Sequence, residues 1–279
     1  MNITFIGGGN MAGAMIQGLL NAPGTSHHIS VVEPFEATRT GLLAKHSSQL
    51  ARLKVFPDVA SASAAAALEV DVIIIAVKPQ VMPEVARSLA PSMKQQLVLS
   101  VAAGIRLQDL SRWLGGHKKL IRAMPNTPAL ISMGITGVTA YPGVDALAKE
   151  QADTLLRSVG EVIWIEHESQ IDAVTALSGS GPAYVFLVIE AMQAAGEKLG
   201  LSAEQASLLA KHTMRGAAEL AQRSSEPPSI LRERVTSKGG TTAAALAVMN
   251  SHGLMEIFSE ALAAANQRGA QMGLEFGAM

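Results

Sequence analysis

The chain has 279 residues, and its 22 lysines and arginines against 23 aspartates and glutamates give a formal net charge of −1. The absence of cysteine excludes a disulfide framework, a cysteine-ligated metal site and a cysteine nucleophile. Because there is no basic excess to attract a phosphate backbone, we expect no nucleic-acid partner.

The N-terminal residues run from a short apolar segment directly into glycines, without the charged start and long apolar core of a signal peptide. Uninterrupted apolar runs such as 72–77 are far shorter than the ~20 residues of a membrane helix. We therefore expect a cytoplasmic protein that is not inserted in a membrane. Its hydrophobic residues, 48% of the chain, should be buried within and between subunits.

The first half of the chain alternates short β-branched runs with longer helical patterns. The runs are continuously apolar, as expected of parallel strands covered by helices on both faces. Strands are predicted at 3–6, 29–32, 72–77, 97–101 and 120–122, with 137–140 and 162–165 extending the sheet, and helices at 11–20, 35–45 and 83–89. Alternating strands and helices predict an α/β fold with a doubly wound parallel sheet.

After about residue 166 the strand signals stop and the pattern becomes helical. A helical stripe beginning near Val185 meets a stop at Gly200, and Ser202 with Gln205 forms a capping box for the next helix. The segment 183–191 is apolar almost all round, which indicates burial between two subunits. We expect two domains, an α/β domain over 1–165 and an all-α dimerisation and substrate-binding domain over 166–279.

The segment after the first strand fits the G-x-G-x-x-A form of the dinucleotide-binding fingerprint, with Gly7, Gly9 and Ala12 at its critical positions. Gly7 permits a tight turn, Gly9 lets a pyrophosphate approach the backbone, and Ala12 lets the helix pack on the strand. The alternative is an ordinary glycine turn. A motif that follows a strand and opens a helix favours a Rossmann-like nucleotide site.

Glu33 lies at the end of the second strand, about 20 residues beyond the glycine motif, where a carboxylate binds the ribose hydroxyls of NAD and repels the 2′-phosphate of NADP. Arg39 is an alternative contact for a 2′-phosphate. Glu33 also suits a solvated turn before Pro34. The choice between NAD(H) and NADP(H) stays open.

Three other motifs carry no chemistry of their own. Gly179-Ser180-Gly181 is not the nucleophile motif G-x-S-x-G, and the segment 238–242 has the letters of a phosphate loop in the wrong order. The seven histidines show no ligand spacing, so we predict no metal.

The segment Gly239-Gly240-Thr241-Thr242 lies before an apolar helix. It is either an anion site at a helix N-terminus or the start of a capped structural helix.

Several segments together resemble the pyrroline-5-carboxylate reductase family, over nearly the whole chain. They are Phe5–Ala12, Ala76-Val77-Lys78-Pro79, Arg122-Ala123-Met124-Pro125-Asn126-Thr127-Pro128, Leu177-Ser178-Gly179-Ser180-Gly181-Pro182-Ala183-Tyr184 and Val235-Thr236-Ser237-Lys238-Gly239-Gly240-Thr241-Thr242. The resemblance implies a Rossmann domain, a helical domain that interlocks with a second subunit, and an active site in the cleft between them. It also implies NAD(P)H-dependent reduction of the cyclic imine 1-pyrroline-5-carboxylate to L-proline, the last step of proline biosynthesis.

The resemblance also implies roles for particular residues. Coenzyme binding falls to Ile6, Gly7, Gly8, Gly9, Asn10, Met11, Ala12, Glu33, Ala76, Val77, Lys78, Pro79, Ala102, Ala103, Gly104 and Asn126, the last near the nicotinamide. Substrate binding falls to Ser237, Gly239, Gly240, Thr241 and Thr242, with the carboxylate on the amides of the last three. Thr242 is the catalytic residue implied, as hydrogen-bond donor to the ring nitrogen. A homodimer through the C-terminal helices follows, with a larger ring of dimers left open.

The chain departs from the family at a few positions. The family usually has Pro where this chain has Lys238, Asn near Ser63, and Asn-Arg where this chain has Glu33-Pro34. The first difference bears on the rigidity of the carboxylate loop, and the last weakens an inference to NADPH. Two alternative functions remain: a β-hydroxyacid dehydrogenase with Lys198 or Lys211 as its catalytic lysine, and a module that senses NAD(P) without turnover.

Overall fold

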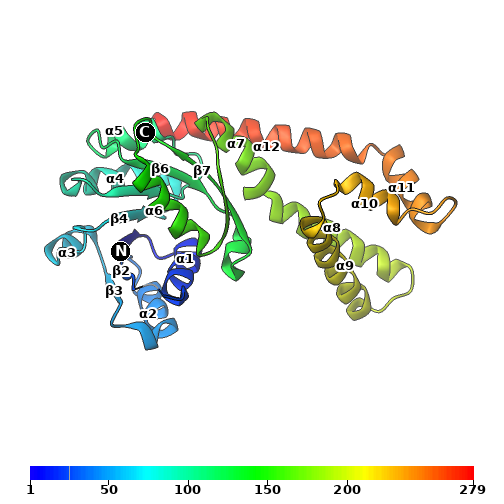
Figure 1. Ribbon diagram of the computed structural model, residues 1–279, viewed down its shortest axis with the longest axis horizontal. Coiled ribbons are helices and arrows are strands. Elements are labelled where there is room, and N and C mark those ends of the chain that lie inside the picture. The colour runs from blue at the N-terminus through cyan, green and yellow to red at the C-terminus, as the bar shows by residue number, and fades with distance from the viewer. Residues whose placement is uncertain (25) are drawn as a thin grey trace. The chain divides into compact units, whose positions relative to one another are not determined.

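The computed structural model describes residues 1–24 and 26–279, and it divides into two compact units. The sheet unit contains Met1–Ser180 and the C-terminal segment Ala265–Met279, and the helical unit contains Gly181–Ala264. Figure 1 shows strands and helices together in the first unit and helices alone in the second. The chain therefore leaves the sheet unit and returns to it at its C-terminal end.

A single eight-stranded sheet, in the order β3-β2-β1-β4-β5-β6-β7-β8, organises the sheet unit. Its neighbouring strands are parallel except for the antiparallel pair β6 and β7. The strands are β1 (Asn2–Ile6), β2 (His28–Val32), β3 (Leu53–Phe56), β4 (Val72–Ile75), β5 (Leu97–Ser100), β6 (Leu120–Met124), β7 (Gly134–Ala140) and β8 (Gly160–Trp164). All of the predicted strands are present, β3 is an additional one, and the predicted doubly wound α/β fold is confirmed.

Helices cover both faces of the sheet, as continuously apolar strands require. Apolar residues of α1, α2 and α6 pack on one face, and those of α3, α4, α5 and the end of α12 pack on the other. These helices are α1 (Asn10–Asn21), α2 (Glu36–Lys45), α3 (Val59–Ala64), α4 (Met82–Leu89), α5 (Leu107–Trp113), α6 (Ala146–Arg157) and α12 (Leu254–Gly277), with the short α7 (Ile171–Val174) following the last strand.

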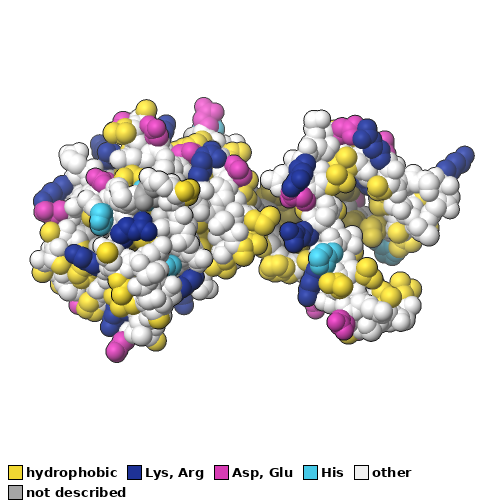
Figure 2. All heavy atoms as spheres, turned by 60° about the horizontal axis from the view of Figure 1, so that its bottom comes forward, with side chains coloured by type: hydrophobic (Ala, Val, Ile, Leu, Met, Phe, Trp, Pro, Cys, Tyr) yellow, Lys and Arg dark blue, Asp and Glu magenta, His cyan; other side chains and the backbone are white. Residues whose placement is uncertain are grey.

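The helical unit consists of α8 (Gly181–Lys198), α9 (Ala203–Arg223), α10 (Pro228–Arg234), α11 (Thr241–Ser251) and the first part of α12. Gly200 has a φ of +98° after α8, and Ser202 caps α9 in a reciprocal capping box with Gln205, so both sequence signals are confirmed. Within the described chain, Ala206 and Ala210 are the buried residues of this unit. Figure 2 shows hydrophobic side chains on its surface.

The stretch Glu168–Lys198 is helical apart from a bend at Ser180, and it includes a five-residue π-helix at Thr175–Gly179. In the described part of the chain it is the segment whose length and composition would suffice to cross a membrane, which the short uninterrupted apolar runs did not indicate. Only 11% of the apolar window within this stretch is buried inside the chain, and one such helix is weak evidence for a membrane span.

Candidate functional site

The turn after β1 can be made only by glycine. Gly7 has a φ of +99°, and a Cβ built on it would lie 2.7 Å from the carbonyl oxygen of Ala76. Its amide donates to the carbonyl oxygen of Val32 at 2.8 Å, which ties the turn to the end of β2. Any side chain here would be strained and would collide with the loop after β4.

The N-terminus of α1 is open to an anion. Gly9 is the N-cap and no side chain caps the helix, so the first amides of α1 lack an intrahelical partner. A Cβ on Gly9 would meet nothing within 4 Å, whereas Ala12 is buried in the core beneath. The space, the amides and the helix dipole together fit a pyrophosphate, as the fingerprint predicts.

Glu33 follows β2 directly and is buried beside the glycine turn. Its Oε2 accepts a hydrogen bond from the Gly8 amide at 2.8 Å, and its Oε1 accepts one from the Phe35 amide at 2.9 Å. Arg39 donates from Nη1 to the carbonyl oxygens of Glu33 and Pro34 at 2.9 and 2.7 Å. The carboxylate is thus oriented by backbone groups and faces the turn that would hold the pyrophosphate.

The remaining predicted coenzyme residues lie at the carboxyl ends of neighbouring strands. Ala76–Pro79 follow β4, Ala102–Gly104 follow β5 and Asn126 follows β6, and β1, β4, β5 and β6 are adjacent and parallel in the sheet. The order reverses direction between β1 and β4, which is the switch point where doubly wound sheets bind ligands. The sheet unit therefore brings these predicted residues to one edge.

Two of these residues also have structural roles. Gly104 has a φ of +73°, and a Cβ on it would lie 3.1 Å from the ring of Phe276 in α12. The Asn126 side chain accepts from the Ile135 amide at 3.0 Å and donates to the Ser178 carbonyl oxygen at 3.3 Å. Both polar ends of Asn126 are therefore engaged in holding the loop after β6 against β7 and the π-helix.

Sequence reasoning missed an ion cluster around the buried Arg122 behind this edge. Arg122 of β6 is buried and lies 3.0 Å from Glu168 and 3.6 Å from Asp172. The Glu168 Oε1 atom also accepts from the Leu107 amide at 2.8 Å, at the start of α5. Glu168 thus links the loop after β5, the strand β6 and the helix leading to the helical unit. A carboxylate far from Arg122 in sequence leaves no local signal for this pairing.

The predicted substrate residues form the loop that opens α11 in the helical unit. Gly239 has a φ of +72°, and Gly240 is the N-cap, its amide donating to the Ser237 carbonyl oxygen at 3.1 Å. Thr241 and Thr242 occupy the first turn of α11, and no side chain caps it. Thr242 is half-buried, and in the described part of the chain its hydroxyl makes no capping hydrogen bond to α11. The alternative in which a threonine caps this helix is therefore not supported.

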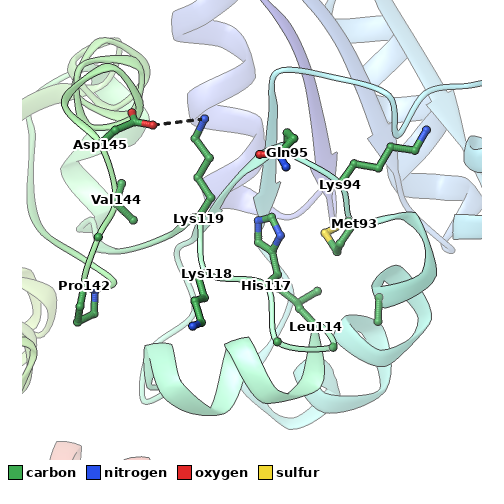
Figure 3. Close-up of a pocket in the computed structure, with 14 residues that line it drawn as sticks. Met93, Lys94, Gln95, Leu114, His117, Lys118, Lys119, Pro142, Val144 and Asp145 are labelled. Carbon is green, nitrogen blue, oxygen red and sulfur yellow. Dashed lines mark ion pairs between the residues drawn. The ribbon is translucent and has the colours of Figure 1, made fainter.

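A different part of the sheet unit carries a hollow of about 610 Å³. Figure 3 shows it at the start of β6, with Lys119 paired to Asp145 at 4.0 Å and the His117 ring among its walls. His117 Nε2 bonds the Gln96 carbonyl oxygen at 2.9 Å, and burial lowers the pKa of this imidazole. The hollow lies at the amino ends of the strands, opposite the predicted coenzyme edge. In the described ranges, 1–24 and 26–279, no group of His, Cys, Asp and Glu could hold a metal.

Both the N-terminal and the C-terminal part of the chain match known protein families. Residues 168–272 match the family model described as pyrroline-5-carboxylate reductase dimerisation, and residues 2–104 match the model of NADP oxidoreductase, coenzyme F420-dependent. The pyrroline-5-carboxylate reductase of Pseudomonas aeruginosa is 45% identical over 99% of this chain and 98% of its own length. That of Haemophilus influenzae is 40% identical over 97% of both chains.

Solved structures agree with these relatives. A pyrroline-5-carboxylate reductase from Coxiella burnetii superposes with a TM-score of 0.88 at 39% identity, over 97% of this chain and 98% of the other. The pyrroline carboxylate reductase of Plasmodium falciparum with NADP bound gives a TM-score of 0.82 at 28% identity, over 98% of each chain.

Proposed function

The chain belongs to the pyrroline-5-carboxylate reductase family, and we propose that its own residues divide the reaction between a coenzyme site in the sheet unit and a carboxylate site in the helical unit. The enzyme reduces 1-pyrroline-5-carboxylate to L-proline with NAD(P)H, the last step of proline biosynthesis. The observation that carries this function is similarity over nearly the full length to curated enzymes of that activity.

The coenzyme site consists of the glycine turn and the loops at the switch point. NAD(P)H supplies the hydride for the reaction. Gly7 shapes the turn, the open position at Gly9 admits the pyrophosphate, and the first amides of α1 bind it. The coenzyme contacts in the sheet unit are Ile6, Gly7, Gly8, Gly9, Asn10, Met11, Ala12, Glu33, Ala76, Val77, Lys78, Pro79, Ala102, Ala103, Gly104 and Asn126. For Asn126 we propose a backbone contact or an indirect one, since its side chain is engaged.

The carboxylate site is the loop from Ser237 to Thr242. The positive φ at Gly239 turns the chain into the start of α11, where no side chain caps the amides of Thr241 and Thr242. The third amide of the loop, that of Gly240, already donates to the Ser237 carbonyl oxygen, so Thr241 and Thr242 supply the free donors. Such a group of amides, helped by the helix dipole, suits a substrate carboxylate. Lys238 is exposed in the same loop and adds a positive charge where the family usually has Pro.

Thr242 is the catalytic residue of the proposal. Reduction adds hydride to the imine carbon and leaves the ring nitrogen with an added proton, which water ultimately supplies. As hydride arrives the nitrogen becomes more basic, so a hydrogen bond donated by the Thr242 hydroxyl strengthens toward the transition state. The chemistry needs no histidine acid, because an imine carbon is already electrophilic and positioning does most of the work.

We propose that the enzyme is an obligate homodimer through its C-terminal helices. The dimerisation model covers 168–272, and large apolar residues of α8 and α12 are exposed in the single chain. Free dimers and a ring of dimers are the two alternatives for the assembly, and a mass measurement in solution separates them. We further propose functional domains at 1–165 and 166–279 and a cytoplasmic location. No nucleic-acid or membrane partner is part of the proposal.

A spectrophotometric assay tests the function directly. The purified protein is mixed with pyrroline-5-carboxylate and either reduced coenzyme, and we expect loss of nicotinamide absorbance with formation of proline. A β-hydroxyacid dehydrogenase would instead be favoured if the protein oxidised hydroxyacids, if Lys211→Ala abolished that activity, and if no imine reduction were detected. Coenzyme binding without turnover of either substrate class would favour a sensing module.

A further inference from the structure

We propose that this enzyme selects NADH over NADPH, and that Glu33 is the residue that excludes the 2′-phosphate. The inference rests on the proposed coenzyme site in the sheet unit. It concerns this chain in particular, because one similar structure contains NADP.

The Glu33 carboxylate is held in one place by the backbone. The amide of Glu33 donates to the Phe56 carbonyl oxygen at 2.9 Å, which anchors the residue between β2 and β3. Gly8 and Phe35 then each donate an amide hydrogen to a different oxygen of the side chain. A carboxylate oxygen has two acceptor directions, so each still accepts a ribose hydroxyl.

The Glu33 carboxylate lies where the adenosine ribose of the coenzyme would bind. A Cβ on Gly8 would lie 3.3 Å from Glu33 Oε2, so the carboxylate borders the turn that binds the pyrophosphate. A ribose attached to that pyrophosphate therefore meets Glu33. Two hydroxyls would satisfy the carboxylate, whereas a 2′-phosphate would place a second anion against a side chain that is only 6% exposed.

Arg39 is the cation that would have to offset this repulsion. Its Nη1 atom is bonded to the carbonyl oxygens of Glu33 and Pro34, so the guanidinium is directed at the backbone of the turn. Glu36 at the start of α2 and Lys54 on β3 are both exposed to solvent. The Glu33 carboxylate, in contrast, is hydrogen-bonded to the glycine turn itself.

The test compares kcat/KM for NADH and NADPH in the wild type, Glu33→Ser and Glu33→Gln. We expect the wild type to favour NADH by about tenfold or more, equivalent to about 1.4 kcal/mol. Glu33→Ser, which removes the charge and makes room, should raise the NADPH-to-NADH ratio by about tenfold or more. Glu36→Ser removes an exposed carboxylate three residues along and should leave the ratio unchanged.

A binding measurement separates this inference from the proposed function. Calorimetry with ADP-ribose and 2′-phospho-ADP-ribose reports the ribose subsite without any imine chemistry, and we expect tighter binding of the first by the wild type. Equal binding of the two compounds, a wild-type preference for NADPH, or an unchanged ratio in both folded Glu33 variants would overturn the role of Glu33. Failure to reduce the imine with either coenzyme would instead overturn the proposed function. Thermal melting checks folding, and Glu33→Gln, which nearly keeps the shape, decides the matter if Glu33→Ser is unstable.

Discussion

The two units bury their hydrophobic residues in different ways. In the sheet unit, Ile73, Ile74 and Ile75 of β4 are inaccessible to solvent and lie between two layers of helices. In the helical unit, Phe186 of α8 is 64% exposed and Met255 of α12 is 72% exposed. Exposed apolar area of this extent marks an interaction surface. The sheet unit closes its own core, whereas the helical unit leaves large apolar side chains uncovered in the single chain, as the proposed dimer requires.

The largest expected effect breaks the helical unit's dependence on a partner. Phe186→Glu places a charge in a surface that the dimer would bury, and we expect aggregate or inactive monomer by light scattering and activity assay. Leu147→Glu is the matched control, because Leu147 is 61% exposed on α6 of the sheet unit. That variant should remain a dimer. A fully active Phe186→Glu monomer would refute the obligate dimer.

The next effect tests whether the sheet unit is stabilised internally. Arg122→Met leaves Glu168 and Asp172 without their buried cation. Because both carboxylates are partly exposed, we expect a loss of about 1–3 kcal/mol of unfolding free energy, less than the ~3–5 kcal/mol of a fully buried pair. Urea unfolding at fixed protein concentration measures the loss. Arg157→Met breaks exposed pairs with Asp153 and Glu161 and should cost about 1 kcal/mol or less. Equal losses in the two variants would show that the ion pairs of Arg122 stabilise the fold no more than the exposed pairs of Arg157.

An effect of comparable size concerns what the helical unit contributes to chemistry. Thr242→Val keeps the side-chain shape and removes the hydroxyl, so kcat should fall by the equivalent of about 1–3 kcal/mol, with a smaller rise in KM. Melting temperature should change little, because Thr242 does not cap α11. Thr241→Val is the control, because it removes the neighbouring hydroxyl and keeps the backbone amides of Thr241 and Thr242 that would bind the substrate carboxylate. Normal kcat with a lowered melting temperature would remove Thr242 from the catalytic residues.

Sequence patterns predicted the sheet unit well because its signals are local. The continuously apolar runs gave the strands, and the glycine motif gave the turn at Gly7 and the open position at Gly9. The pattern missed β3, since its four residues include an exposed Lys54 and only Leu53 is buried. It also missed the return of Ala265–Met279 to the sheet unit. That return depends on Phe276 entering a distant core, which no local pattern records.

The site was predicted less completely for the same reason. The positions of Glu33 and the loop before α11 follow from motif spacing, but their partners do not. The bond of Asn126 to Ser178 and the pairing of Arg122 with Glu168 join residues that are 52 and 46 positions apart in sequence. The π-helix at Thr175–Gly179 likewise needs the packed structure, where a Cβ on Gly179 would lie 2.6 Å from Met124.

The smallest expected effect is a pH dependence of stability, which we expect from the sheet unit. Burial is the main cause that lowers the pKa of His27, His46 and His117, all in the sheet unit. As the pH falls, these histidines take up protons in the unfolded chain before they do so in the folded one. Their contribution to the free energy of unfolding is therefore fully present above the ordinary histidine pKa of about 6.5, and it is lost as pH falls through the lower pKa values of the folded protein. Urea unfolding between neutral and mildly acidic pH measures this. His117→Gln should flatten the dependence, and an unchanged slope would exclude His117 as a contributor.

The return of the C-terminal segment also sets an order of events during synthesis. Arg112 and Arg87 bond the carbonyl oxygens of Gly277 and Met279, and Phe276 fills the core beside Gly104. A ribosome produces all of the helical unit before it produces these residues, so the nascent sheet unit waits with one face partly uncovered. The exposed apolar side chains of α8 emerge during that interval. The surface of the proposed dimer is therefore complete before the sheet unit has closed its own core.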